Sequence, residues 1–167
     1  MDVVIIGNSA AGLAALEEFR KYDRKSHVVM ISREGVIPYS RVLLPYVLRG
    51  KLPYEGMMIR EEAYFRQMDV ECVAGEAVSL DDAGKQVVLA DGRSFPYDRL
   101  LIATGSHAVM PPIPGIQDER ICNMWTKEDA DRLRVYFETY QKVVVIGSGF
   151  VALQAAWAAR YRGLDVT

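Results

Sequence analysis

The chain has 167 residues, 50% of them hydrophobic, and its 20 basic and 22 acidic side chains give a formal net charge of −2. Such a chain can bury one core of ordinary size. Its balanced charge argues against nucleic acid and anionic membranes as partners, because both select an excess of Lys and Arg. No apolar run approaches the roughly 18 residues of a membrane span, and the first predicted strand starts at Asp2, so we expect a soluble, cytoplasmic protein.

Residues 2–32 have the pattern of one βαβ unit. A β-branched apolar strand begins at Asp2 and ends at Gly7, a helix follows over Gly12 to Tyr22, and a second buried strand covers His27 to Ile31. Residues 33–58 contain three prolines that interrupt helical periodicity, so we expect an irregular segment there. Long irregular loops inside compact domains are often functional.

The next part of the chain predicts one short helix, one parallel strand and a small antiparallel excursion. The helix covers 61–68 and the strand 70–73, and short strands punctuated by turn residues follow. A further buried strand is expected over Arg99 to Ala103. The proline-rich connector Met110 to Gly115 then predicts a domain boundary, which divides the chain into residues 1–115 and 116–167.

The remainder predicts the opening of a second βαβ unit. Thr126 and Asp129 are spaced to cap a helix over Lys127 to Tyr140. A strand begins at Lys142, and the helix Phe150 to Arg162 is apolar on most faces, which is typical of a helix covered by neighbours. Fewer residues follow Lys142 than the roughly 30 of a complete βαβ unit, so we expect an N-terminal fragment of a longer protein.

Each βαβ unit carries a glycine-rich turn between its strand and its helix, VVIIGNSAAG at residues 3–12 and VVVIGSGFVA at residues 143–152. Such a turn places a pyrophosphate on the free amides of a helix N-terminus. In the first turn Gly7 permits the bend, Ser9 stands where a second glycine is usual, and Gly12 allows close packing of helix on strand. The alternative is an ordinary strand-to-helix turn. Two such turns predict electron transfer between two nucleotides.

An acidic residue is expected on the ribose of a bound dinucleotide, about 20 positions beyond the last glycine of the turn. That count ends at Ser32, and Glu34 lies two residues further, so Glu34 is the candidate. The alternative is a solvated loop carboxylate. The histidines and the two cysteines, Cys72 and Cys122, form no nucleophile or metal-ligand pattern, and we therefore assign no catalytic residue and no metal site.

Four segments together carry a family resemblance. VVIIGNSAAGLAA, PYSRVLL at 38–44, YDRLLIATGS at 97–106 and VVVIGSGFVALQAA occur in the order typical of the pyridine nucleotide-disulfide oxidoreductase superfamily. The chain most resembles its branch of ferredoxin, rubredoxin and nitrite reductase flavoproteins. The resemblance implies an α/β fold, with a Rossmann-like FAD-binding domain of parallel sheet and small antiparallel excursion, followed by the incomplete start of a second Rossmann-like domain for NADH or NADPH.

The resemblance also implies roles for individual residues. Arg41 in PYSR matches an arginine that contacts FAD, and its planar fork suits a diphosphate; the alternative is a surface arginine. Backbone at Ala77 is implied to touch adenine, and Thr104 and Gly105 to lie near the flavin. The resemblance implies that the pyrophosphate of FAD is held by Gly7, Ser9, Ala11 and Gly12. It implies that the pyrophosphate of the nicotinamide nucleotide is held by Gly147, Gly149 and Ala152.

The chain departs from the family at its redox chemistry. Disulfide reductases of the superfamily carry a CxxxxC pair after the first βαβ unit, whereas residues 33–64 contain no cysteine. Tyr46 and Gln154 stand where relatives often have lysine and glutamate. We therefore expect an FAD-dependent NAD(P)H oxidoreductase that passes electrons from flavin directly to a redox protein or metal centre, and we leave a homo-oligomer open.

Three other functions remain open at this point. The first is a non-catalytic FAD- or ADP-binding module or subunit. The second is an NAD(P)H oxidase or disulfide reductase that uses a distant cysteine, for which Cys72 is the candidate. The third is an NAD-only dehydrogenase. The PYSR loop and the small strands argue against the third, since a simple Rossmann dehydrogenase needs neither.

Overall fold

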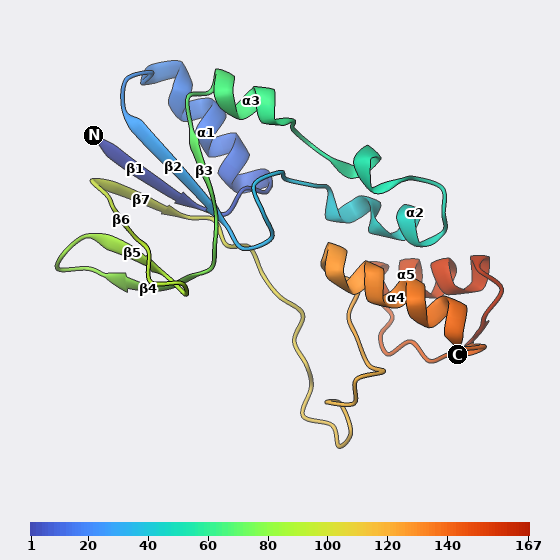
Figure 1. Ribbon diagram of the computed structural model, residues 1–167. Helices are drawn as coiled ribbons and strands as arrows, with labels where there is room; N and C mark the ends of the chain where they lie inside the picture. Colours follow the sequence, from blue (N-terminus) through green and yellow to red (C-terminus); the bar gives the residue numbers. More distant parts are fainter. The chain divides into compact units, whose positions relative to one another are not determined.

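A computed structural model describes all 167 residues and divides them into two compact units (Figure 1). Unit 1 comprises Met1–Tyr39 and Met58–Gly105, and unit 2 comprises Ser40–Met57 and Ser106–Thr167. The segment 40–57 therefore interrupts unit 1 in sequence while folding with unit 2. The sequence predicted a different kind of division, between residues 1–115 as the FAD-binding part and residues 116–167 as the start of the NAD(P)-binding part. That division stays a prediction.

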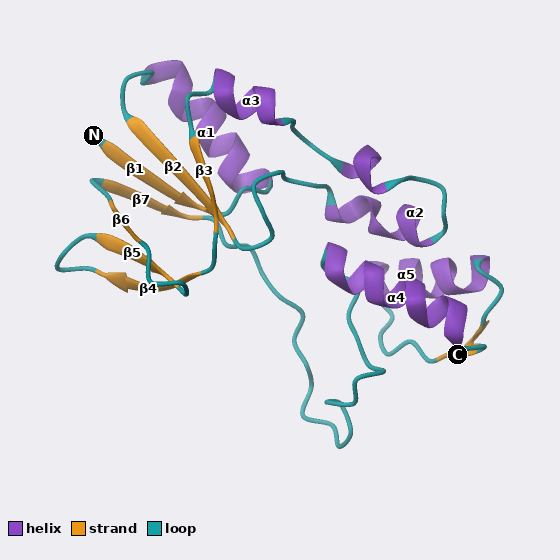
Figure 2. Cartoon of the chain, in the orientation of Figure 1, coloured by secondary structure: helices purple, strands orange, loops and turns teal.

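Unit 1 is built on a parallel four-stranded sheet with the order β3-β2-β1-β7. Each strand is short and rich in β-branched residues, and Asp2 pairs with His27 at the start of the β1 and β2 ladder. Figure 2 shows the strands side by side. Their bounds are β1 Asp2–Ile6, β2 His27–Ser32, β3 Glu71–Ala74 and β7 Arg99–Ile102. This confirms the expected Rossmann-like arrangement.

The two faces of this sheet bury alternate residues of its strands. Val3, Ile5 and Met30 pack with residues of α1 (Ala10–Tyr22) and α3 (Glu62–Gln67). Their neighbours one position along, such as Val4 and Ile31, pack instead against Val87 and Leu89 of the small sheet. That sheet is antiparallel, as expected, with β4 Ala77–Asp81, β5 Gln86–Leu89 and β6 Ser94–Pro96.

The strand β7 is less buried than its apolar sequence predicted. It pairs with β1 alone and so forms the edge of the sheet, and Leu101 and Ile102 are 37% and 57% exposed. The expectation of a buried strand over Arg99 to Ala103 was therefore right about the strand and wrong about its burial. Neither hydrophobic cluster of unit 1 includes Leu101 or Ile102, so these two side chains have no packing layer over them within unit 1.

The end of α1 is fixed by a buried arginine. Arg20 is 4% exposed, and its guanidinium donates to four backbone carbonyl oxygens of the adjoining turns. Its acceptors are Asp23 at 3.2 Å, Ser26 at 2.9 Å, Met68 at 2.7 Å and Asp69 at 2.5 Å. A buried charge of this kind is tolerated because four of its five polar hydrogens meet an acceptor.

The segment 40–57 contains helices, although its prolines predicted an irregular segment. It forms the 3₁₀ turns η1 (Arg41–Leu43) and η2 (Tyr54–Met57) and the short helix α2 (Leu44–Leu48). Pro45 lies in the first turn of α2, where its missing N–H is no loss. Proline here starts a helix, and the expectation of an irregular segment was wrong for this reason.

The rest of unit 2 follows the predicted order of elements. It comprises α4 (Lys127–Thr139), β8 (Lys142–Val143), α5 (Phe150–Tyr161) and β9 (Asp165–Val166), which pairs parallel to β8. The helix α2 packs against both α4 and α5. Between α2 and α5 the Arg49 guanidinium, which is buried, lies 4.3 Å from the Tyr46 ring centroid and 3.7 Å from that of Trp157.

The helix α5 is more exposed than its apolar sequence predicted. Phe150 is 87% exposed and Leu153 is 59% exposed, and Ile146 in the preceding turn is 72% exposed. Among residues 1–167 the sheet beside α5 has two short strands, so one face of the helix has no packing partner there. No helix in the chain is long and apolar enough to cross a membrane.

The two ends of unit 1 that flank segment 40–57 are paired with each other. Tyr39 and Met58 form an antiparallel bridge, and the N–H of Ile59 donates to the Pro38 carbonyl at 2.9 Å. The two strands of chain that leave and re-enter unit 1 are thus hydrogen-bonded to each other within unit 1.

Candidate functional site

The carboxyl ends of the four parallel strands place most of the predicted site residues at one edge of unit 1. From β1 the chain continues to β2 and β3 on one side and later returns to β7 on the other side. The connections therefore reverse direction at β1. In open α/β sheets, ligands bind outside the carboxyl ends of strands at such a reversal. The glycine turn after β1 occupies this position.

The first glycine turn is packed so closely that two of its glycines admit no side chain. Gly7 has φ +113°, and a methyl group on it would lie 2.2 Å from the carbonyl oxygen of Ala103. A methyl group on Gly12 would lie 1.9 Å from the Gly7 carbonyl oxygen. These contacts bring α1 and the segment after β7 against the turn, in line with the roles predicted for Gly7 and Gly12.

The N-terminus of α1 has the features of an anion site. Ser9 is the N-cap residue, yet its side chain makes no capping hydrogen bond, and the first turn carries no acidic residue. Ser9, Ala10 and Ala11 are exposed. The first amides of a helix have no partners within it and carry partial positive charge, so they can bind a phosphate that approaches from solvent.

The loop after β2 is tied to this turn by a residue that sequence reasoning missed. The side-chain amide of Asn8 donates to the carbonyl oxygens of Gly35 at 3.0 Å and Val36 at 3.2 Å. Glu34, the residue predicted to bind ribose, immediately precedes them, and the hydroxyl of Tyr39 donates to its carboxylate. The sequence did show an asparagine inside the glycine turn. It could not show which carbonyls that side chain contacts, because they lie 27 and 28 residues away along the chain.

Two further predicted residues lie at the same edge, and Ala77 lies just beyond it. The N–H of Ala103 donates to the Ile6 carbonyl at 2.8 Å, which holds the following Thr104 and Gly105 beside the first glycine turn. Gly105 has φ +72°. Ala77 begins β4 shortly after the carboxyl end of β3 and is half-buried. The structure thus gathers Gly7, Gly12, Glu34, Thr104 and Gly105.

The second glycine turn lies in unit 2 and is more open than the first. Gly147 has φ +131°, and a methyl group on it would meet the Ala152 side chain at 3.4 Å. Gly149 is the N-cap of α5, and nothing lies within 4 Å of where its methyl group would be. Packing inside the chain therefore does not require glycine at 149. A ligand backbone approaching α5 would require it.

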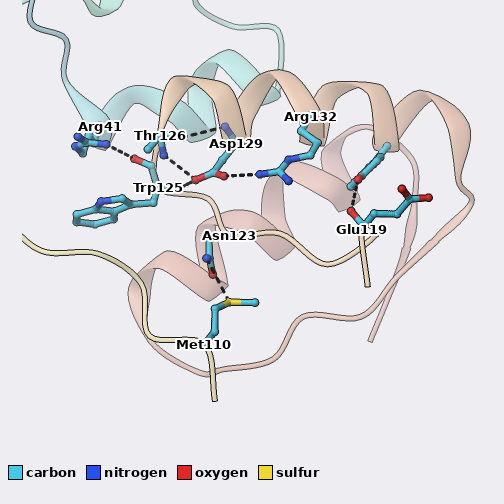
Figure 3. Close-up of polar contacts among 9 residues, drawn as sticks. Arg41, Met110, Glu119, Asn123, Trp125, Thr126, Asp129 and Arg132 are labelled. Atoms are coloured by element: carbon cyan, nitrogen blue, oxygen red, sulfur yellow. Dashed lines mark hydrogen bonds and ion pairs between the residues drawn. The ribbon is translucent and has the colours of Figure 1, made fainter. Parts of the chain in front are cut away.

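Arg41 belongs to unit 2, where it contacts the start of α4 (Figure 3). Its Nη1 donates to the Trp125 carbonyl at 2.7 Å, and its guanidinium carbon lies 5.2 Å from the Trp125 ring centroid. The expected capping box is confirmed: Asp129 N–H donates to Thr126 Oγ1 at 3.1 Å, and Thr126 N–H donates to Asp129 Oδ2 at 3.0 Å. The box fixes the backbone that Arg41 contacts.

Neither cysteine has the environment of a reactive thiolate. Cys72 and Cys122 are free and half-buried. Burial raises the pKa of Cys72 to about 11, and the nearby Glu71 carboxylate adds to the rise; burial likewise raises the pKa of Cys122. Reactive cysteines have lowered pKa values. No group of three or more His, Cys, Asp or Glu side chains is arranged to hold a metal ion.

Comparison with known proteins identifies the family. The sequence profile of the pyridine nucleotide-disulphide oxidoreductases matches residues 1–167. The chain belongs to this family. Its parallel sheet, its small antiparallel sheet and its two glycine turns are therefore those of a pyridine nucleotide-disulphide oxidoreductase, and the predicted family resemblance and fold class are confirmed.

Individual relatives are similar along nearly the whole chain. It is 34% identical to the NADH-dependent phenylglyoxylate dehydrogenase subunit epsilon of Aromatoleum evansii, over 98% of this chain and 39% of the relative. It is 33% identical to an NADH oxidase of Methanocaldococcus jannaschii, over 99% and 39%. The solved ferredoxin reductase for the CYP199A2 system of Rhodopseudomonas palustris superposes with a TM-score of 0.90 at 29% identity, over 99% of this chain and 41% of that chain. The chain thus spans about two fifths of these relatives.

Proposed function

We propose that the chain is the FAD- and NAD(P)H-binding part of an oxidoreductase that transfers electrons to a redox protein or metal centre. The observation that carries the proposal is the open, uncapped N-terminus of α1 at the strand-order reversal, followed in the same chain by a second glycine turn. FAD, when bound, supplies hydride acceptance from reduced nicotinamide and electron release to an acceptor. The cytoplasm is the proposed location.

The chain's own residues bind and orient the two nucleotides. In unit 1 the turn Gly7 to Gly12 holds the pyrophosphate of FAD, Glu34 accepts hydrogen bonds from ribose, Ala77 borders adenine, and Thr104 and Gly105 border the flavin. Arg41 is proposed as a further FAD contact. The turn with Gly147, Gly149 and Ala152 holds the pyrophosphate of NADH or NADPH. No side chain is assigned as an acid or base.

The acceptor is proposed to take electrons without a protein thiol. The raised pKa values of Cys72 and Cys122 support this, because disulfide chemistry starts from a thiolate. The similarity to a ferredoxin reductase supports a redox protein as acceptor. A second candidate is electron transfer to oxygen, which the similarity to an NADH oxidase favours.

The proposal is tested by adding FAD to the purified chain, desalting, recording the visible spectrum, and identifying the nucleotide released on denaturation. Retained FAD supports the proposal; bound NAD or adenine nucleotide without flavin would overturn the FAD assignment. Exposed Ser9 offers a sharp variant, since Ser9→Asp places a negative charge where the pyrophosphate is proposed. Aspartate is a good N-cap, so the fold should be retained while FAD binding is lost.

Ser9→Gly is the matched control, because it restores the second glycine of the fingerprint and should keep FAD binding. Equal FAD affinity in Ser9→Asp and the wild type would contradict the proposed pyrophosphate position. Reduction of the bound flavin by NADH or NADPH, followed by oxygen uptake or reduction of an added ferredoxin, separates the two candidate acceptors.

A further inference from the structure

The side chain of Asn8 joins two loops, one proposed to bind the diphosphate of ADP and the other proposed to bind its ribose. Asn8 lies in the turn after β1, and its Nδ2 donates to the carbonyl oxygens of Gly35 and Val36 in the turn after β2, at 3.0 and 3.2 Å. An amide NH₂ group has two hydrogens, and both carbonyls therefore receive one. Asn8 is half-buried, so water does not fully replace these bonds when they break.

The loop that Asn8 holds carries Glu34. Gly35 has φ +100° and follows Glu34 directly, so the two carbonyls that Asn8 binds set the backbone course just after the carboxylate. The Tyr39 hydroxyl donates a hydrogen bond to the Glu34 carboxylate. The side chain of Glu34 is thus oriented by Tyr39, and its backbone is anchored to the glycine turn by Asn8.

We infer that Asn8 is a positioning residue for nucleotide binding, which sets the ribose-binding Glu34 at a fixed distance from the pyrophosphate-binding turn. This inference rests on the proposed function of that turn. Diphosphate and ribose are joined covalently in ADP, so both contacts form together only when the two loops are already spaced to match. Asn8 acts through Glu34 and needs no contact with the nucleotide itself.

The test is a double-mutant cycle on ADP affinity, measured by calorimetry with the whole chain. The variants are Asn8→Ala, Glu34→Gln and the two combined. Loss of two hydrogen bonds that hold Glu34 in place should weaken ADP binding about tenfold. In the Glu34→Gln background the same substitution should change affinity less than twofold, because the residue through which Asn8 acts has already been impaired.

A matched ligand and a matched variant complete the experiment. With 2′-deoxy-ADP the effect of Asn8→Ala should shrink, since the ribose hydroxyl proposed to meet Glu34 is missing. Asn123→Ala removes the only other asparagine, whose amide contacts Met110 in unit 2, and should leave ADP affinity unchanged. If Asn8→Ala does not fold, Asn8→Ser, which keeps one donor, enters the same cycle with a smaller expected loss.

The outcomes separate this inference from the proposed function. Failure of the wild-type chain to bind ADP would overturn the proposed function itself. ADP binding that is unchanged by Asn8→Ala, or weakened equally with and without Glu34→Gln, would overturn the positioning role while leaving the nucleotide site intact.

Discussion

Replacing Gly12 by alanine should destabilise the chain, although the same change stabilises most helices. Alanine is favoured over glycine in a helix interior by about 1 kcal/mol. At Gly12, however, the new methyl group would lie 1.9 Å from the Gly7 carbonyl oxygen and 3.4 Å from Ile5 Cγ2. The oxygen belongs to the backbone of a turn that is itself packed on Ala103, so α1 has to move by about 1.5 Å to reach an ordinary contact distance.

The size of the effect follows from overpacking. Forcing an extra methyl group into a filled site costs about 1–3 kcal/mol. At Gly12 the obstacle is a backbone oxygen at 1.9 Å, so the upper part of that range, about 2–3 kcal/mol, applies. Subtracting about 1 kcal/mol for the gain in helix propensity leaves an expected loss of about 1–2 kcal/mol in the free energy of unfolding. Because the displaced turn is the proposed pyrophosphate site, ADP affinity should fall more than tenfold, beyond what the stability change explains.

Gly149→Ala is the matched substitution in the second glycine turn. Nothing lies within 4 Å of the added methyl group, and φ at Gly149 is −77°, which alanine adopts freely. Its free energy of unfolding should stay within about 1 kcal/mol of the wild type. Urea unfolding followed by circular dichroism measures both variants. A Gly12→Ala chain as stable as the wild type would refute the close packing of α1 on its turn.

Three further predictions concern the hydrogen bonds of Arg20, the hydrogen bonds of Asp23 and the burial of Cys72. Arg20→Met should lower the free energy of unfolding by about 2–4 kcal/mol, because it leaves four backbone carbonyls without their donor. The control Arg66→Met removes an exposed ion pair and should change the free energy of unfolding by less than about 0.5 kcal/mol. Thermal unfolding measures both variants. Hydrogen bonds from Ser26 and Lys25 lower the pKa of Asp23 to about 2, so its contribution to stability is present above the unfolded value near 4 and is lost as the pH falls from about 4 to about 2. Asp23→Asn should therefore flatten the pH dependence of Tm in that window, and an unaltered acid profile would count against these bonds. The pKa of Cys72, raised from 9.0 to about 11, lowers its thiolate fraction about 100-fold, and mass spectrometry should find its alkylation at neutral pH slower by a similar factor than that of glutathione.

The parts of the fold that sequence predicted are those set by local patterns. Apolar β-branched runs ending in glycine located β1 and its turn, and the spacing of Thr126 and Asp129 located the start of α4. Features that depend on sheet order were not accessible. The strand β7 lies at the edge of the sheet and its Ile102 packs in neither hydrophobic cluster, although its sequence is as apolar as that of a central strand.

The other features that the sequence did not predict depend on long-range contacts and on one proline. Pro45 reads as a helix breaker in sequence, yet in the first turn of α2 it is compatible with a helix. No prediction was made for Arg20, because only the fold brings Met68 and Asp69 to its guanidinium. Asn8 likewise gains its partners only when the turns after β1 and β2 come together.

The pairing of Tyr39 with Met58 has a consequence for how the chain can be divided. Since residues 40–57 leave and re-enter unit 1 at two paired positions, a short turn that joins Tyr39 to Met58 could replace that whole segment without breaking a strand of the parallel sheet. Cutting the chain once after Gly105 would leave unit 1 with residues 40–57 still attached and without their packing partners α4 and α5. Shortening this loop, together with the cut, would therefore give unit 1 alone, which keeps the first glycine turn but lacks Arg41.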